Sequence, residues 1–292
     1  MSWRNPVLNG DHEPNEEVYC NGRFSPLAEA RISPLDRGFL YGDGIFTTMR
    51  AEQGHVLYLN DHLERLRQSL TEMRLTVPLT VDWGSTLAEL LRRNRLENQV
   101  ASVKVVVTRG RVGTLGLPDT GQATVVIYAR RYEPPAPSHH RTGYRLHVFR
   151  DGFSPPLSRL KSLNYLYHLM ARQAALDAGA DEAVILDVHG RLTETAAGSL
   201  LLKTAGEWWT PHSVYQLPGI ALRHASKILE ETGFRVARRP ADVSDLFSAD
   251  TIWVLNSLMG VMPVSHVDQR LVSAPAPEEA ARLRGQLFAR GR

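Results

Sequence analysis

The chain has 292 residues, of which 43% are hydrophobic and 22% are charged. This length supports a substantial core and, at roughly 100–200 residues per domain, predicts two domains. No run approaches the roughly 18 uninterrupted apolar residues of a membrane span, and MSWRNPVLNGDHEPNEE at the start lacks the apolar stretch of a signal peptide. We therefore expect a cytoplasmic protein with no membrane partner.

Charge and cysteine content exclude other classes. Lys and Arg outnumber Asp and Glu by 34 to 31, and although the sequence pI is near 9.1, these charges are scattered along the chain. Binding to nucleic acid therefore gains little support. Cys20 is the single cysteine, so it cannot form an internal disulfide and has no second thiol for a metal site or redox pair.

The first half of the chain reads as an α+β domain over residues 1–131. Short β-prone runs from Val18 onward, separated by Asn-Gly, Gly-Asp-Gly and Gln-Gly turns, predict a meander of antiparallel strands. Asn60 and Asp61 are expected to cap a helix, with Glu64 in a capping box. A second helix is expected over 85–96, and ASVKVVVTRG and QATVVIYARRY have the Val, Ile and Tyr content of buried strands.

A proline-dense segment, YEPPAPSHH, predicts an interdomain linker over 132–140. The second domain, 141–292, should then contain a helix from about Ser162 to Ala178, ended by Gly179. Strands are expected near 144–150, at EAVILDV, LTET and SLLLK, and over 235–239 and 251–256, with a helix in LPGIALRHASKILEETGF and another at the C-terminus.

A lysine among leucines, Lys161, is the first candidate for chemistry. It could simply lay its methylenes on apolar surface and keep its ammonium in water. If buried, its amine would lose its proton more readily and could form a Schiff base with an aldehyde cofactor. A pyridoxal phosphate site also needs a carboxylate beside the pyridine nitrogen, and Glu194 lies 33 residues later in RLTETAAGSLL, where a solvated turn residue is the alternative.

Donors for a phosphate dianion are also present. Ile220 and Ala221 follow Pro218-Gly219 at a helix start, where free N–H groups and the helix dipole can hold an anion, unless this is a plain helix start after a turn. Asn256-Ser257 ends a strong strand and offers hydroxyl and backbone donors, although polar residues commonly end strands. Arg65 lies off the apolar face of its helix, which also suits a solvated arginine.

Taken in order, these segments resemble the fold-type IV pyridoxal phosphate enzymes, which include branched-chain aminotransferases, D-amino acid aminotransferases and aminodeoxychorismate lyases. The similarity covers nearly the whole chain and rests on ARISPLDRGFLYGDGIFTT, HLERLRQSL, KSLN, DEAVILDVHGRLTETAAGSL, LPGIALRHASKILEETG and NSLMGVMPV. It implies a smaller N-terminal α/β sandwich domain and a larger C-terminal cofactor domain with a pseudo-barrel of mostly antiparallel strands.

The resemblance also implies site roles. Lys161 would be the Schiff-base lysine and proton shuttle, Glu194 would meet the pyridinium nitrogen, and the phosphate would be held by Arg65, Ile220, Ala221 and Ser257. Branched-chain aminotransferases have Gly-Thr where this chain has Asn256-Ser257, which leaves the role of Asn256 open.

Two features are most similar to aminodeoxychorismate lyase: NSLMGVMPV, and Thr47-Thr48 where branched-chain aminotransferases usually carry Glu-Gly. Losing the glutamate suits a substrate with two carboxylates. Arg50 and Arg109 are candidate partners of those carboxylates, or else surface arginines near turns. Thr47 or Thr48 could orient a leaving group, and because adjacent strand residues face opposite sides, the sequence leaves open which one does.

We therefore expect a lyase that converts 4-amino-4-deoxychorismate to 4-aminobenzoate and pyruvate in folate biosynthesis. The alternative is a branched-chain or D-amino acid aminotransferase, and a more distant one is a non-catalytic protein that binds an acidic partner through its basic surface. The resemblance further implies a homodimer and a functional link to aminodeoxychorismate synthase.

Overall fold

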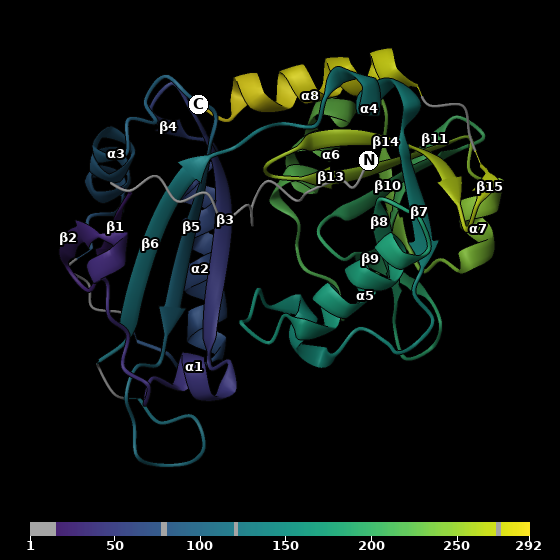
Figure 1. Cartoon of the computed structure of the whole chain (residues 1–292). Coiled ribbons are helices and arrows are strands. Elements are labelled where there is room, and N and C mark those ends of the chain that lie inside the picture. The colour runs from purple at the N-terminus through teal and green to yellow at the C-terminus, as the bar shows by residue number, and fades with distance from the viewer. Residues whose placement is uncertain (1–15, 77–80, 120–121, 273–275) are drawn as a thin grey trace. The chain divides into compact units, whose positions relative to one another are not determined.

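The computed structural model of the protein describes residues 16–76, 81–119, 122–272 and 276–292 and divides the chain into two compact units (Figure 1). The first unit comprises Met1–Glu133, Leu160–Asn164 and Gly291–Arg292, and the second comprises Pro134–Arg159 and Tyr165–Arg290. Each unit combines helices with a sheet, so the predicted two-domain α+β class is confirmed. The five residues around Lys161 belong to the first unit, although most of the second half of the chain does not.

The first unit is built on a six-stranded antiparallel sheet in the order β2-β1-β6-β5-β3-β4. Its longest pairings join β3 to β5 and β5 to β6, so these three strands form the centre of the sheet. The strands are β1 (Glu17–Cys20), β2 (Arg23–Pro26), β3 (Gly44–Glu52), β4 (His55–Val56), β5 (Ala101–Thr108) and β6 (Thr124–Arg131), and the helices are η1 (Leu27–Glu29), α1 (Arg37–Tyr41), α2 (Leu59–Glu72) and α3 (Trp83–Arg93).

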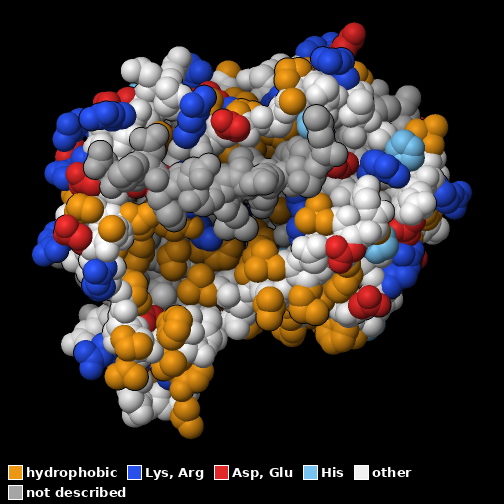
Figure 2. All heavy atoms as spheres, in the orientation of Figure 1, with side chains coloured by type: hydrophobic (Ala, Val, Ile, Leu, Met, Phe, Trp, Pro, Cys, Tyr) orange, Lys and Arg blue, Asp and Glu red, His pale blue; other side chains and the backbone are white. Residues whose placement is uncertain are grey.

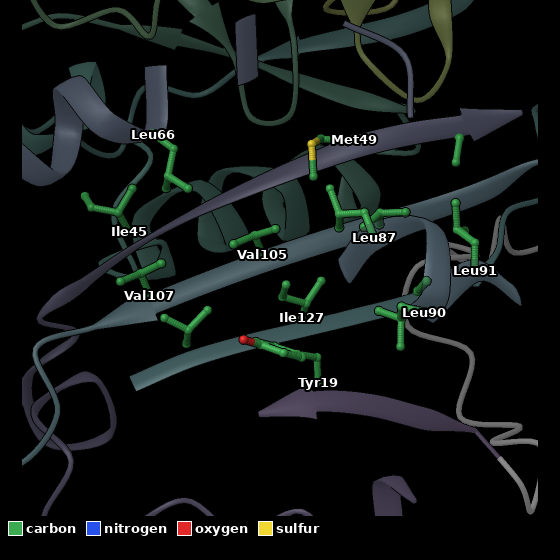
Figure 3. Close-up of a cluster of buried hydrophobic side chains, with 14 of the residues drawn as sticks. Tyr19, Ile45, Met49, Leu66, Leu87, Leu90, Leu91, Val105, Val107 and Ile127 are labelled. Atoms are coloured by element: carbon green, nitrogen blue, oxygen red, sulfur yellow. The ribbon is translucent and has the colours of Figure 1, made fainter. Parts of the chain in front are cut away.

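Side chains that alternate along these strands form the core of the first unit on one face of the sheet (Figure 3). Ile45 and Met49 of β3 share that face with Val105 of β5 and Ile127 of β6, and leucines of α2 and α3 cover it. Because successive strand residues point to opposite faces, Phe46, Thr48 and Arg50 lie on the other face. Only the side chains on this second face of β3 point away from the hydrophobic core.

The first long helix begins earlier than its expected cap. Helix α2 starts at Leu59, after Tyr58 in a left-handed conformation with φ of 54°, so the predicted cap at Asn60 and Asp61 is wrong. Glu64 accepts hydrogen bonds from Arg67 and Gln68 on the helix surface, and the structure gives it no capping-box bond. Asp61 still stabilises the first turn, because a negative charge there meets the positive end of the helix dipole.

A buried ion cluster fixes the start of β3. Asp43 accepts hydrogen bonds from the guanidinium groups of Arg37 and Arg109, with Nε to Oδ2 distances of 2.7 and 2.8 Å. Burial by itself would raise the pKa of Asp43, but the hydrogen bonds from Arg109 and Arg37 outweigh it and hold the pKa below its usual value.

Arg109 is therefore a structural residue, and its expected role in binding a substrate carboxylate is corrected here. Its remaining N–H groups donate to the carbonyls of Met73, Arg74 and Pro118 at 2.7 to 2.9 Å, and it is 1% exposed. With Asp43, these acceptors use all five N–H donors of a guanidinium, so none is left for a ligand.

The second unit contains a mixed sheet in the order β12-β11-β10-β13-β14-β7-β8-β9, with β15 beside β14. Three pairings are parallel: β11 with β12, β14 with β7, and β7 with β8. The strands are β7 (Tyr144–Val148), β8 (Glu182–Leu186), β9 (Leu192–Thr195), β10 (Ser199–Thr204), β11 (Glu207–Pro211), β12 (Val236–Arg239), β13 (Thr251–Asn256), β14 (Gly260–Val267) and β15 (Arg270–Leu271). The helices are α4 (Pro137–Thr142), η2 (Pro156–Arg159), α5 (Leu166–Asp177), α6 (Ile220–Glu231), α7 (Val243–Ser248) and α8 (Pro277–Arg290).

Three expectations for this half need correction. Helix α5 begins at Leu166, because residues 160–164 pair with a strand edge in the first unit. Helix α4 begins at Pro137, inside the segment 132–140 that was expected to be an extended linker. Strand β14 was missed although it is well paired, and Pro263 within it, opposite Trp253, is the residue type that argues against a strand.

Among the described residues, no helix has both the length and the apolar character needed to cross a bilayer.

The Asp43 cluster predicts a stability effect. Replacing Asp43 with Asn leaves two buried guanidinium groups without their counter-charge, and we expect a loss of about 3–5 kcal/mol in the free energy of unfolding. Glu64→Gln breaks an ion pair whose side chains are 48% and 68% exposed, so it should destabilise the chain far less than Asp43→Asn. Urea unfolding of both variants measures the difference.

The same series tests the sign of the pH dependence. Since folding lowers the pKa of Asp43, its contribution is complete above the unfolded value of about 4 and is lost as the pH falls through the folded value. The difference in the free energy of unfolding between the native chain and Asp43→Asn should therefore become smaller in acid. A gap that stays constant or widens there contradicts this account.

Candidate active site

Lys161 lies on the free edge of β3. The β3 backbone pairs with the segment 160–164: Phe46 N–H donates to Lys161 O at 2.8 Å, and Leu163 N–H donates to Gly44 O at 2.9 Å. A Cβ on Gly44 would come within 2.6 Å of Val107 O of β5 and 2.8 Å of Leu163 Cδ1, so glycine is needed where β3 passes between β5 and this segment. Backbone hydrogen bonds therefore fix the position of Lys161. Its leucine-rich surroundings predicted the start of a helix, but the helix begins later, at Leu166.

The Lys161 side chain shares the face of β3 that points away from the hydrophobic core. Leu160 belongs to the core cluster, whereas the half-buried Lys161 extends its Nζ over the ring of Phe46, 4.8 Å from the ring centroid. Phe46 is 7% exposed and lies outside that core cluster. We call this side of the sheet the lysine face.

Lys104 of β5 lies on the lysine face and was not predicted as a site residue. Its Nζ is 4.4 Å from the centroid of the same Phe46 ring. The register places Lys104 beside Thr48 of β3 and Tyr128 of β6, so the three form a row across the sheet. Burial alone lowers the pKa of Lys104, and no charged group contributes to the shift. A half-buried ammonium in this setting is suited to receive an anion.

The sequence contained a signal for Lys104: it interrupts the apolar run ASVKVVV in a strand whose other face is buried. Assigning Lys104 to a site requires knowing which β3 residue lies beside it. That register depends on contacts between distant segments.

The structure separates the two threonines. Thr47 is 1% exposed and points toward α2, where its Oγ1 is 2.9 Å from Nδ1 of His62. Arg65 of α2 approaches the same hydroxyl, with Nη2 at 3.4 Å. Thr48, being next in the strand, faces the lysine face. The expected substrate contact of Thr47 is thus corrected: its side chain belongs to the interior between β3 and α2, and the hydroxyl beside Phe46 and Lys104 is that of Thr48.

Arg50 also points to the lysine face, but it is already paired. Its Nε donates to Glu52 at 2.7 Å, Nη2 lies 2.7 Å from the same carboxylate, and the guanidinium lies over the ring of Tyr132. With 5% exposure and a neutralising acid two residues away, Arg50 is a weaker candidate than Lys104 for a substrate carboxylate.

In the second unit, Glu194 lies on β9 and is 5% exposed, so it is not a solvated turn residue. The backbone N–H of Leu217 approaches its Oε1 at 3.4 Å, and His168 Nε2 lies 3.9 Å from that oxygen. A carboxylate removed from water in this way is costly unless it meets positive charge or hydrogen-bond donors.

The N-terminus of α6 has the features of an anion site. Its N-cap, Gly219, offers no side-chain cap, and the first helical residues Ile220 and Ala221 are buried. A Cβ on Gly219 would lie 2.4 Å from Oγ of Ser199, so the close approach of these two segments requires glycine. Uncapped N–H groups at the start of a 12-residue helix attract a phosphate.

Asn256 shapes the turn after β13. Its Oδ1 accepts hydrogen bonds from the backbone N–H groups of Leu258 and Met259 at 3.1 and 2.8 Å, and its Nδ2 donates to Ala197 O at 3.1 Å. These bonds fix the backbone around Ser257. Asn256 is thus engaged with the protein, while Ser257 stays the candidate donor to a ligand.

The predicted site residues therefore divide into two groups. The first unit holds Lys161, Arg65 and the β3 residues, and the second unit holds Glu194, the start of α6 and the Asn256-Ser257 turn.

Residues 44–267, most of the chain, match the model of the family described as Amino-transferase class IV. The chain belongs to this family. This membership confirms the family recognised from the sequence motifs. The match extends from the first residue of β3 to the last residue of β14.

Two class IV relatives and one solved structure illustrate the similarity. A putative branched-chain-amino-acid aminotransferase of Methanocaldococcus jannaschii is 33% identical over 262 residues, covering 88% of this chain and 90% of that protein. An aminodeoxychorismate lyase of Vibrio harveyi is 28% identical over 268 residues, covering 89% and 97%. A T.th. branched-chain amino acid aminotransferase with pyridoxamine 5'-phosphate has a TM-score of 0.81 and 25% identity, covering 94% of this chain and 95% of its own.

Proposed function

We propose that this class IV protein is an aminodeoxychorismate lyase that converts 4-amino-4-deoxychorismate to 4-aminobenzoate and pyruvate. The observation that carries the proposal is the lysine face, where the ammonium groups of Lys104 and Lys161 contact the same ring of Phe46. A substrate with two carboxylates suits a surface that presents positive charge and a neutral hydroxyl, from Thr48, and on which Arg50 is already neutralised by Glu52.

The cofactor is pyridoxal 5'-phosphate, and the donor set of this chain fits it. The uncapped start of α6 at Ile220 and Ala221, together with Ser257 of the same unit, would hold the phosphate. The resemblance extends this role to Arg65. Glu194 would meet the pyridine nitrogen, where a protonated ring offsets the cost of burying the carboxylate. When bound, this cofactor withdraws electrons from the carbon that carries the substrate nitrogen.

The chain's own part in the reaction centres on one amine. Lys161 would hold the cofactor through its amine, and its Nζ, once the substrate amine has taken its place, would accept the proton from the carbon bearing nitrogen. The same amine can return that proton to the enol carbon of the departing group. The ether bond breaks, the departing group leaves as pyruvate, and the ring becomes aromatic as 4-aminobenzoate, so no oxidant, water or second amino acid is consumed.

Thr47 and Thr48 support the lyase proposal through a hydroxyl on the lysine face. The sequence had suggested a different reason, the loss of a negative charge from that face. Replacement of glutamate by Thr47 does not change the charge of the lysine face, because Thr47 points to α2 and bonds to His62. Replacement of glycine by Thr48 does add a hydroxyl to that face. We propose that Thr48 orients the departing group.

A product assay tests the proposal. Purified protein should be yellow, and borohydride should remove the visible band and label Lys161. Incubation with aminodeoxychorismate should give 4-aminobenzoate and pyruvate in equal amounts without added keto acid. Lys161→Ala should lose at least about a thousandfold in rate, a barrier increase of roughly 4 kcal/mol.

The second candidate is an aminotransferase, favoured by the 33% identity to a putative branched-chain enzyme. Amino transfer that depends on a keto acid, with no 4-aminobenzoate, would replace the lyase proposal with this one. A colourless protein that never binds pyridoxal phosphate would contradict both and return to the non-catalytic alternative.

Lys104 is expected to bind a substrate carboxylate. Lys104→Met keeps the stem on Phe46 and removes the charge, so KM should rise by about 10- to 100-fold, because a charge-assisted hydrogen bond contributes about 1.5–3 kcal/mol. Lys203→Met removes an ammonium at 3.7 Å from Glu279 in the second unit and is the matched control. An unchanged KM in Lys104→Met would remove Lys104 from the site.

We also propose a homodimer. Apolar side chains gather on the surface over α1 (Figure 2). Five of them are 44% to 75% exposed: Ile32, Leu35, Phe39, Leu40 and Tyr41. An apolar patch of this kind on a protein in water is typical of a contact surface, and a second copy is the occupant that the resemblance implies. Light scattering should give twice the chain mass of 32.6 kDa, and a single-chain mass would contradict the proposal.

A further inference from the structure

We infer that His168 is a positioning residue for Glu194: its Nε2–H holds the carboxylate in place from within the second unit. This inference rests on the proposed function in one respect, namely that Glu194 meets the pyridine nitrogen of the cofactor. The pairing of His168 with Glu194 is a property of the chain itself and is argued from its own contacts.

The two side chains form a buried pair. His168 Nε2 lies 3.9 Å from Glu194 Oε1, and each side chain is only 7% exposed. The distance is longer than a hydrogen bond, so the imidazole edge lies close to the carboxylate without bonding to it directly. His168 comes from the first turns of α5 and Glu194 from β9, so the contact joins a helix to a strand of the same unit.

Stacking holds the imidazole in place. The ring of Tyr165 lies parallel to it, with centroids 4.5 Å apart and an interplanar angle of 5°, and the ring of Tyr167 meets it edge-on at 5.8 Å. Tyr165 is itself anchored, because its hydroxyl donates to Ala196 O at 2.7 Å. Burial and then the charges of Glu194 and Glu182 raise the pKa of Tyr165, which therefore stays a neutral donor.

The surroundings decide which nitrogen of His168 carries the proton. Nδ1 is buried and has no hydrogen-bond partner among the described residues, whereas Nε2 has a carboxylate oxygen as its neighbour. A neutral imidazole has one N–H and one lone pair, and a buried N–H without an acceptor costs more than a lone pair without a donor. The proton should therefore sit on Nε2 and point toward Glu194.

His168 is thus a second neighbour of the Glu194 carboxylate. Leu217 N–H and His168 Nε2 approach Oε1 at 3.4 and 3.9 Å, so two groups of the same unit face one oxygen of the carboxylate. The neighbouring acid on β8, Glu182, is paired separately with Arg172 one turn further along α5. A carboxylate with a fixed orientation presents its charge to the cofactor's ring nitrogen without first having to be ordered.

Crossed substitutions separate positioning from packing. His168→Gln keeps an N–H near the position of Nε2 but loses the stacked ring, and His168→Phe keeps the ring but loses the N–H. The readout is the ratio of dissociation constants for pyridoxal phosphate and its 1-deaza analogue, which lacks the ring nitrogen. We expect His168→Phe to lower the native preference for pyridoxal phosphate about tenfold, with affinity for the analogue unchanged, and His168→Gln to retain most of it.

A reversed pattern, with the Phe variant normal and the Gln variant impaired, would show that His168 only packs, and equal behaviour of both variants would overturn the inference as well. His189→Phe, at an exposed turn of the same unit, is the control for a general effect of the substitution. If the native protein binds neither compound, the proposed function fails, and the role of His168 toward the cofactor fails with it.

The pairing has an independent readout in the full chain without cofactor. Nitrogen-15 NMR of the His168 ring distinguishes a proton on Nε2 from one on Nδ1. We expect Nε2–H in the native chain and loss of this preference in Glu194→Leu. A proton on Nδ1 in the native chain overturns the inference, whether or not the protein is a lyase.

Discussion

The backbone pairing of residues 160–164 with β3 is the constraint on which the lysine face depends. Two hydrogen bonds, from Phe46 N–H to Lys161 O and from Leu163 N–H to Gly44 O, join a pentapeptide from the middle of the chain to a sheet formed by its first half. The alternation of strand residues then turns Leu160 into the core and Lys161 toward Phe46. The position of the Lys161 backbone is thus fixed by main-chain hydrogen bonds.

The same alternation divides the side chains of β3 between the hydrophobic core and the lysine face. Odd-numbered residues Ile45, Thr47 and Met49 pack or bond against the helices, whereas Phe46, Thr48 and Arg50 line the opposite face. The charged groups near β3 also differ in role. The Asp43 cluster saturates every N–H donor of Arg109 and is structural, while the half-buried Lys104 has its pKa lowered by burial alone and is suited to an external anion.

Much of this organisation could be predicted from the sequence, and the exceptions have physical causes. The strand over 251–256 and the helix after Pro218-Gly219 carry strong local signals, and both are present. Lys161 and Glu194 were selected from local motifs, and the structure places each in a semi-buried or buried setting. The expected roles of Arg109 and Thr47 failed because each depends on which way a side chain points, and Lys104 was missed because its neighbours come from other strands. Register and facing are set by contacts between distant segments, which a local pattern does not contain.

Gly44, the second glycine of the Gly-Asp-Gly turn, also lets its two neighbouring segments approach β3 closely. A methyl group there would push against the carbonyl of Val107 on one side and the side chain of Leu163 on the other. Rotation of the Leu163 side chain would relieve the second contact, but the Val107 carbonyl belongs to the neighbouring strand β5, so β3 itself would have to shift. One missing carbon atom therefore keeps β3 where it can pair with both β5 and the segment that carries Lys161.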